Sequence, residues 1–339
     1  MSFNQLVADD FVVSADSITA GLWTDSEIPT ITTFFTSSTQ KNGASGNYYL
    51  NVFSNEATSS LEFAVTYGNQ LGSGSELYNS TVDGKSYTST IYGQYRSLVL
   101  GDENSNFVFG GVTSSDFWAI SIDRNRYKEG LFPGSTTLLI SGSSGIISLT
   151  DNSNAVASVE FNDAGRVFQL VSGSAGTVFT GRNNQGYSDA SGSYGWFLPD
   201  ISTYLLNPRA LGSLASGGGI TLNPVTGSDS DDKNPARLFS AISSSDAASF
   251  TANSEETITS DYIFVRPRSS QYNYSENPSF ISGSTGEVLF SSFINNPTTY
   301  ITTVGLYNDT NELLAVAKLS RPLKKDFTKE ALIRIKLDF

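Results

Sequence analysis

The distribution of apolar positions along the chain predicts a mostly β protein. Short segments that alternate between apolar and polar residues are separated by Gly, Ser, Asn and Asp, which is typical of strands joined by turns. No long helical periodicity lies between them, so we expect antiparallel β-sandwich layers with a few short helices. The predicted strands are 47–54, 61–68, 97–101, 106–112, 117–123, 136–142, 145–151, 157–163, 166–173, 176–182, 261–269 and 287–294.

Two short helices are expected at 207–216 and 234–244, because each begins with Asn-Pro. Asn can cap a helix, and Pro suits its first position. A stretch rich in Gly, Ser and Asp lies between them. This stretch predicts an N-terminal β-rich domain (1–215), a linker or loop (216–235) and a C-terminal β domain (236–339).

The C-terminal end carries the clearest alternation. Residues 300–307 and 313–319 predict a hairpin around the turn "NDTN" (308–311), with Leu313, Ala315, Ala317 and Leu319 on one face. Residues 331–339, "ALIRIKLDF", predict a final strand with an apolar face that ends on Phe339. We expect this strand to dock in a sheet of its own subunit or of a neighbour. Its opposite face holds Leu332, Arg334, Lys336 and Asp338.

Two residue types that many catalytic and metal sites require are missing. The chain has no Cys and no His, which excludes disulfides, Ser-His-Asp and Cys-His hydrolases, and nearly all zinc, copper and haem sites. Aromatic residues reach 12%, whereas charged residues make up only 16%, and this mixture suits a β-rich fold. We therefore expect a non-enzymatic protein without a cofactor.

The charge is acidic but uneven. A net charge of −13 disfavours nucleic-acid binding. Residues 318–339 contain seven basic and three acidic residues, so this tail is +4 and the preceding 317 residues are −17. Such opposite charges favour association with further copies or with an acidic neighbour. The candidate interface residues in the tail are Lys324, Lys325, Arg334 and Lys336.

The start of the chain, "MSFNQLVADDFVV", has no basic region followed by a long apolar run. We therefore expect no signal peptide. No stretch approaches the ~20 apolar residues that a membrane-spanning helix needs, so we expect no membrane span.

A second candidate interface lies in "IDRNRYKEGLFPG" (122–134), which groups Arg124, Arg126 and Tyr127. Arg and Tyr are favoured at protein interfaces because they combine large contact areas with polar tips. A solvated strand end before a Pro-Gly turn is the alternative.

Other candidate sites have simpler alternatives. An aromatic cluster at 193–206 could stack on sugar rings through Tyr194, Trp196, Phe197 and Tyr204, but such clusters are more often core or subunit interface. Three neighbouring carboxylates could bind calcium: Asp229, Asp231 and Asp232. The EF-hand pattern is broken at Lys233, so a solvated acidic loop is favoured. The Gly-rich 68–76 lacks a phosphate-binding pattern and indicates a turn.

The C-terminal segment "TTVGLYNDTNELLAVAKLSRPLKKDFTKEALIRIKLDF" resembles the closing segment of virion structural proteins of contractile-tailed phages, notably those of marine cyanobacteria. Residues 89–101, 121–141 and 256–283 are similar to the same group, and "GLYNDTNELLAVAKL" is similar to modules of tail-fibre and baseplate proteins. The resemblance implies a virion component of the tail or baseplate, made in the host cytoplasm, with copies of itself and other virion proteins as partners. It implies no active site.

The sequence is also compatible with three alternatives. One is a capsid decoration or neck protein, and another is a host-receptor or carbohydrate-binding module, which requires Trp196 and Tyr204 to face an open groove. The third is a glycosidase with two facing carboxylates, although spacing alone selects no pair among the 33 acidic residues.

Overall fold

The computed structural model describes residues 4–22, 33–36, 49–53, 60–75, 78, 81, 86–179, 185–214, 217–228, 233–243, 250–275 and 277–338. They belong to two compact units. Unit 1 comprises Met1–Ser17 and Thr257–Phe339, and unit 2 comprises Ile18–Glu256. The predicted linker 216–235 therefore lies inside unit 2 and does not separate domains. The division falls instead on two strands that cross the boundary, β1 (Phe11–Gly21) and β17 (Asn253–Val265).

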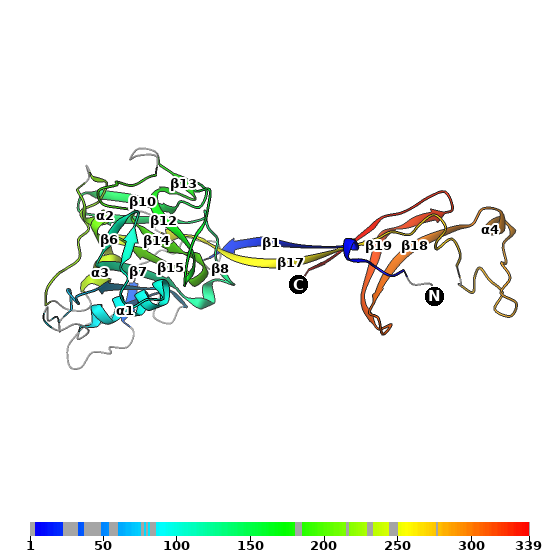
Figure 1. Ribbon diagram of the computed structural model, residues 1–339, viewed down its shortest axis with the longest axis horizontal. Coiled ribbons are helices and arrows are strands. Elements are labelled where there is room, and N and C mark those ends of the chain that lie inside the picture. The colour runs from blue at the N-terminus through cyan, green and yellow to red at the C-terminus, as the bar shows by residue number, and fades with distance from the viewer. Residues whose placement is uncertain are drawn as a thin grey trace. The chain divides into compact units, whose positions relative to one another are not determined.

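Unit 2 is built on a large antiparallel sheet, which confirms the mostly β prediction (Figure 1). Within the described residues, its main path runs in the order β16-β9-β10-β12-β14-β15-β7-β4-β3-β2, and β11 and β13 also pair with β12. The strands are β2 (Thr33–Thr36), β3 (Tyr49–Phe53), β4 (Leu61–Asn69), β7 (Asp116–Ile122), β9 (Thr137–Gly142), β10 (Gly145–Asp151), β11 (Glu160–Asn162), β12 (Gly165–Ser174), β13 (Thr177–Val178), β14 (Gly195–Leu198), β15 (Thr203–Leu206) and β16 (Phe250–Thr251).

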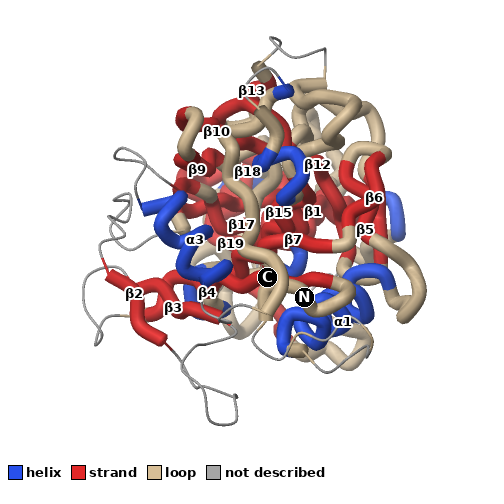
Figure 2. The backbone as a smooth tube through the Cα atoms, turned by 90° about the vertical axis from the view of Figure 1, so that its left-hand side faces the viewer, coloured by secondary structure: helices blue, strands red, loops and turns tan. Residues whose placement is uncertain are grey.

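The central strands of this sheet, β7, β14 and β15, are buried on both faces. Along β7, Trp118 and Ile120 enter one hydrophobic cluster, whereas Phe117 and Ala119 enter a second one, because successive side chains of a strand point to opposite faces. Helices α2 (Pro208–Gly212) and α3 (Lys233–Ser243) contribute to the first cluster. Helix α1 (Tyr87–Leu100) and the hairpin of β5 (Phe107–Phe109) and β6 (Val112–Ser114) contribute to the second. Figure 2 shows α1 and α3 beside the strands.

The two Asn-Pro helices are confirmed, although only one Asn acts as a cap. The Asn207 side chain accepts a hydrogen bond from the Arg209 N–H at 3.1 Å, and Pro208 begins α2. Asn234 lies inside α3 and bonds instead to the backbone of Val225, through Val225 N at 2.7 Å and Val225 O at 3.0 Å. This pair of bonds fixes the preceding loop on the helix.

Two strand predictions are wrong, and a third, 106–112, spans the turn at Gly110 and Gly111 between β5 and β6. Residues 97–101 form the end of α1, whose buried side chains include Ile91, Tyr92 and Val99. The helix stops at Gly101 in the left-handed region (φ 63°), where an added Cβ would overlap the Asp163 carboxylate. At 287–294 the chain forms no strand but enters the short helix α4 (Ser291–Asn295).

Unit 1 contains two small sheets. Strands pair in the order β1-β17-β20, where β20 is Ile333–Asp338, and β8 (Gly130–Leu131) pairs with the unit 2 end of β17. The second sheet is the hairpin of β18 (Thr298–Tyr307) and β19 (Leu313–Asp326). A small hydrophobic cluster joins the two, with Ile263, Leu306, Ile333 and Ile335 buried at its centre.

The terminal hairpin and the final strand are therefore confirmed. The Asn308 side chain organises the turn by accepting from the N–H groups of Thr310 and Glu312. The register of the hairpin shifts between Ile301, opposite Leu323, and Thr303, opposite Lys318, so β19 bulges around Pro322, which has no N–H to donate. Phe339 lies outside the described residues.

Candidate functional site

The basic tail does not present all its charges to solvent. Lys324 is exposed, but Lys325 is fully buried, so the proposed interface role of Lys325 is wrong. Its Nζ donates to three neutral oxygens, Ser269 O at 2.9 Å, Asn273 Oδ1 at 2.9 Å and Asp326 O at 3.0 Å. Lys325 continues the inward face of β19 that also holds Ala315, Ala317 and Leu319, and its buried ammonium group binds residues 269–273 to this strand.

The predicted basic face of β20 is present. Arg334 and Lys336 are exposed, whereas the alternate residues Ile333 and Ile335 are buried. The Arg334 guanidinium lies 5.4 Å from the centre of the Tyr262 ring, on the neighbouring strand β17, within cation–π range.

Acidic neighbours partly neutralise the positive charge of this face. Lys336 Nζ is 2.9 Å from Asp338 Oδ1, and this hydrogen bond raises the pKa of Lys336, with a smaller contribution from Asp16 on β1. The hydrogen bond from Ser260 Oγ and then that from Lys336 lower the pKa of Asp338. Asp16 and Lys336 thus mark the two outer strands of one small sheet, one acidic and one basic.

Strand β1 is the feature that the sequence interpretation missed. Ten of its eleven residues are exposed, and Ser14 is the exception. Phe11, Val12 and Val13 form a consecutive apolar run with exposed fractions of 46%, 50% and 68%. The sequence does indicate a strand here, because "FVVSADSITAG" contains several β-branched residues. A strand that buries neither face is unusual in a folded domain, because strands normally pack one face on a core.

The second candidate interface makes most of its contacts within unit 2. It consists of Arg124, Arg126 and Tyr127. It follows β7 in the 3₁₀ turn η3 (Arg124–Arg126). Arg126 Nη2 is 2.8 Å from Glu62 Oε1, and its Nε donates to Leu61 O at 3.0 Å. Tyr127 packs against the first hydrophobic cluster, and the Arg124 guanidinium lies 4.8 Å from its ring. Of the three, only Arg124 belongs to the exposed surface.

The aromatic cluster at 193–206 is core. Tyr194, Phe197 and Tyr204 belong to the first hydrophobic cluster and Trp196 to the second, and all four are buried. Phe197 and Tyr204 stack with their ring centres 4.8 Å apart. The sugar-stacking interpretation of these residues is therefore wrong, since neither Trp196 nor Tyr204 faces an open groove.

The described buried carboxylates have structural partners. Burial raises the pKa of Asp116, whose carboxylate accepts from the Tyr67 hydroxyl at 2.9 Å. Burial likewise raises the pKa of Asp151, which accepts from Gly134 N at 2.9 Å. No group of three or more His, Cys, Asp or Glu that could hold a metal occurs in the described part of the chain. Asp229, Asp231 and Asp232 lie outside the described residues.

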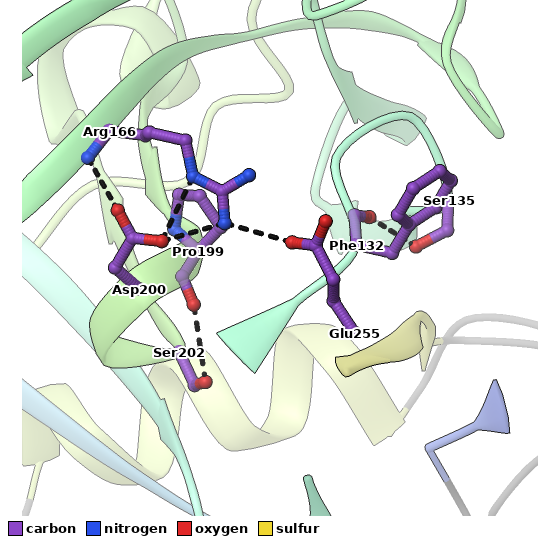
Figure 3. Close-up of polar contacts among 7 residues, drawn as sticks. All are labelled: Phe132, Ser135, Arg166, Pro199, Asp200, Ser202 and Glu255. Atoms are coloured by element: carbon purple, nitrogen blue, oxygen red, sulfur yellow. Dashed lines mark hydrogen bonds and ion pairs between the residues drawn. The ribbon is translucent and has the colours of Figure 1, made fainter. Parts of the chain in front are cut away.

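An ionic cluster anchors the unit 2 end of β17 (Figure 3). Arg166, on β12, lies between two carboxylates: its Nη2 is 2.7 Å from Asp200 Oδ1 and 2.8 Å from Glu255 Oε2. Its backbone N–H also donates to Asp200 Oδ2 at 2.7 Å. Asp200 belongs to the 3₁₀ turn η4 (Pro199–Ile201). The cluster thus ties β12, η4 and β17 together beside the boundary between the units.

Comparison of the chain with models of known protein families, with curated proteins and with solved structures gave no match. None of the described helices has the length and apolar character needed to cross a membrane.

Proposed function

We propose that the chain is a non-enzymatic structural component of a tailed-phage virion that assembles with copies of itself and with neighbouring virion proteins. The tail or baseplate is the preferred location, because the C-terminal segment resembles proteins of that region. The observation that carries the self-assembly part of the proposal is the exposure of β1 on both faces. An extended strand with exposed apolar residues and an open edge is a template for association with another chain.

The charge distribution supports unit 1 as the assembling part. Unit 1 contains nine basic and eleven acidic residues, a net charge of −2, whereas unit 2 contains eleven basic and twenty-two acidic residues, a net charge of −11. Copies of unit 2 repel one another, but copies of unit 1 meet almost no net repulsion. The relevant charges are therefore those of the two units, and not those of an acidic body and a basic tail. The reason is that the acidic N-terminal residues belong to the same unit as the tail.

The second candidate is a capsid decoration or neck protein. Exposed strands for assembly suit that role equally well, so the two candidates differ only in location. Labelled-antibody imaging of intact particles separates them: label on the tail or baseplate supports the proposal, and label on the head or neck supports the alternative.

Mass spectrometry of purified virions, with heads and tails separated first, tests the proposal itself. We expect peptides of this chain in the tail fraction, in a constant ratio to other structural proteins across preparations. Absence of the chain from purified particles would overturn the proposal.

A further inference from the structure

We infer that copies of this chain join head to tail through unit 1, with the outer edge of β1 in one copy pairing with the outer edge of β20 in the next. This inference rests on the proposed self-assembly and adds to it the two surfaces that meet. The partner is a second copy of the same chain, and the bonds are backbone hydrogen bonds that extend the small sheet.

The topology leaves both edges open. In the order β1-β17-β20, β17 is paired on both sides, whereas β1 and β20 each have one hydrogen-bonded neighbour among the described strands. Six consecutive residues of β20, Ile333–Asp338, pair with β17 in an unbroken register from Val265 to Ser260. Its outer edge is therefore regular over the same length and can accept a further strand.

The charges on the two edges differ in sign. Arg334 and Lys336 lie exposed on β20, and Asp16 lies exposed on β1. Within the described residues, neither Arg334 nor Asp16 forms an ion pair within 4 Å. Pairing β20 with β20 brings basic side chains together, and pairing β1 with β1 brings acidic ones together. With Asp338 counted, β20 carries a net charge of +1, and β1 carries −1 through Asp16. The pairing of β1 with β20 therefore brings strands of opposite net charge together, and such charge patterns select partners and register.

Some of the exposed apolar residues of unit 1 lie on these two strands or beside them. Phe11, Val12 and Val13 precede Asp16 on β1, and Leu332, with an exposed fraction of 60%, directly precedes β20. Extension of the sheet by a neighbouring copy covers part of this surface, and the hydrophobic effect then adds to the backbone hydrogen bonds.

Two different edges make a heterologous contact. A contact of this kind repeats from copy to copy and produces a closed ring or a filament, whereas contact between two identical edges stops at a two-fold dimer. The inference therefore predicts assemblies of three or more copies.

Engineered cysteines test which edges meet. The chain has no Cys, so no native thiol can form a disulfide and every link comes from the engineered residues. The variants are the single substitutions Asp16→Cys, Arg334→Cys and Lys336→Cys, together with the double variants Asp16→Cys/Arg334→Cys and Asp16→Cys/Lys336→Cys. A link within one copy is excluded, because β1 and β20 flank β17 and are about 9.5 Å apart, while a disulfide needs Cα atoms within about 7 Å. The matched control is Asp309→Cys, exposed in the hairpin turn.

Under mild oxidation of the full chain, we expect the double variants to form ladders of linked copies on denaturing gels. We also expect an equimolar mixture of Asp16→Cys with Arg334→Cys or with Lys336→Cys to form a linked pair, while each single variant and the control stay unlinked. The native mass of each reduced variant reports whether it still folds and assembles like the unmodified chain.

Three results would overturn the inference. Dimers formed by Asp16→Cys alone would show that β1 pairs with β1. Unlinked double variants whose native mass is still that of an oligomer would remove the β1–β20 contact but leave the proposed self-assembly intact. A native mass of one chain for the unmodified protein would contradict both the β1–β20 contact and the proposed self-assembly.

Discussion

The Arg166 guanidinium lies 2.8 Å from the Glu255 carboxylate and joins β12 to the start of β17. Glu255 directly precedes Glu256, the last residue of unit 2. Arg166 also binds Asp200, so a single side chain holds two carboxylates that lie far from it in the sequence. The ion pairs are partly exposed, which limits the stability that each contributes.

Replacement of Arg166 by Ala should lower the free energy of unfolding of unit 2 by about 1–2 kcal/mol, because both carboxylates lose charged hydrogen bonds. All three Trp residues of the chain fall in unit 2, so Trp fluorescence during urea unfolding measures this unit alone. The matched control is Arg209→Ala, on the exposed surface of α2, with an expected change within about 0.5 kcal/mol. Equal stability losses in both variants would contradict a specific role for Arg166.

Replacement of Lys325 by Met should destabilise unit 1 by about 1–3 kcal/mol, because Ser269 O, Asn273 Oδ1 and Asp326 O lose their buried donor. Hydrogen exchange of the full chain, followed at residues 266–275 and 313–326, measures the loss. Lys324→Met is the control, since its side chain is exposed. If the Lys324 variant exchanges as fast as the Lys325 variant, burial is not the cause.

Residues whose packing depends on distant parts of the chain could not be predicted from the sequence. The alternation in "ALIRIKLDF" correctly gave the two faces of β20, because a strand near a core follows a period of two. Lys325 was misassigned because a basic residue was expected to be exposed, although it continues the inward face of Ala315, Ala317 and Leu319 on β19. The segment 97–101 was misassigned because a short apolar run fits a strand or the last turn of a helix equally well.

The division into units also lay beyond sequence patterns. The stretch 216–235 has linker-like composition, yet Ile220 and Leu222 within it are buried in the first hydrophobic cluster. The actual boundary crosses β1 and β17. Pairing between residues near the start of the chain and residues beyond 250 leaves no compositional mark in either segment. The β-branched run of β1 favours a strand, but its exposure on both faces could not be predicted, because it depends on pairing with β17.

Stability of unit 2 should depend on pH through Asp151. Burial raises the pKa of Asp151 in the folded state above its ordinary value of 3.8, so the folded protein holds this proton to higher pH than the unfolded chain. The contribution to stability is therefore fully present below the unfolded pKa, and it is lost as pH rises through the folded pKa. Asp151→Asn should gain stability relative to the unmodified chain as pH rises from 4 to about 8.

Urea unfolding at several pH values, again followed by Trp fluorescence, measures this difference. Glu103→Gln, on the exposed surface, is the control and should track the unmodified chain at every pH. A constant stability difference between Asp151→Asn and the unmodified chain across this range would contradict the prediction.

Charge removal from unit 1 should weaken self-association. The triple variant Lys324→Gln/Arg334→Gln/Lys336→Gln leaves the buried Lys325 in place, and we expect about a tenfold loss of association affinity at low salt. The loss should shrink at high salt, where exposed charges are screened. The matched control removes three exposed positive charges from unit 2, at Lys128, Arg209 and Arg237. An equal loss in both variants would mean that net charge, rather than the face on β20, governs association.

Sedimentation velocity of the full chain tests the central claim, self-assembly through unit 1, most directly. We predict species well above the 36.4 kDa of one chain at micromolar concentration. Val13→Lys, at an exposed position of β1, should return the mass to that of one chain, whereas Phe161→Lys, at an exposed position of β11 in unit 2, should not. A mass of 36.4 kDa for the unmodified chain at every concentration would contradict the account.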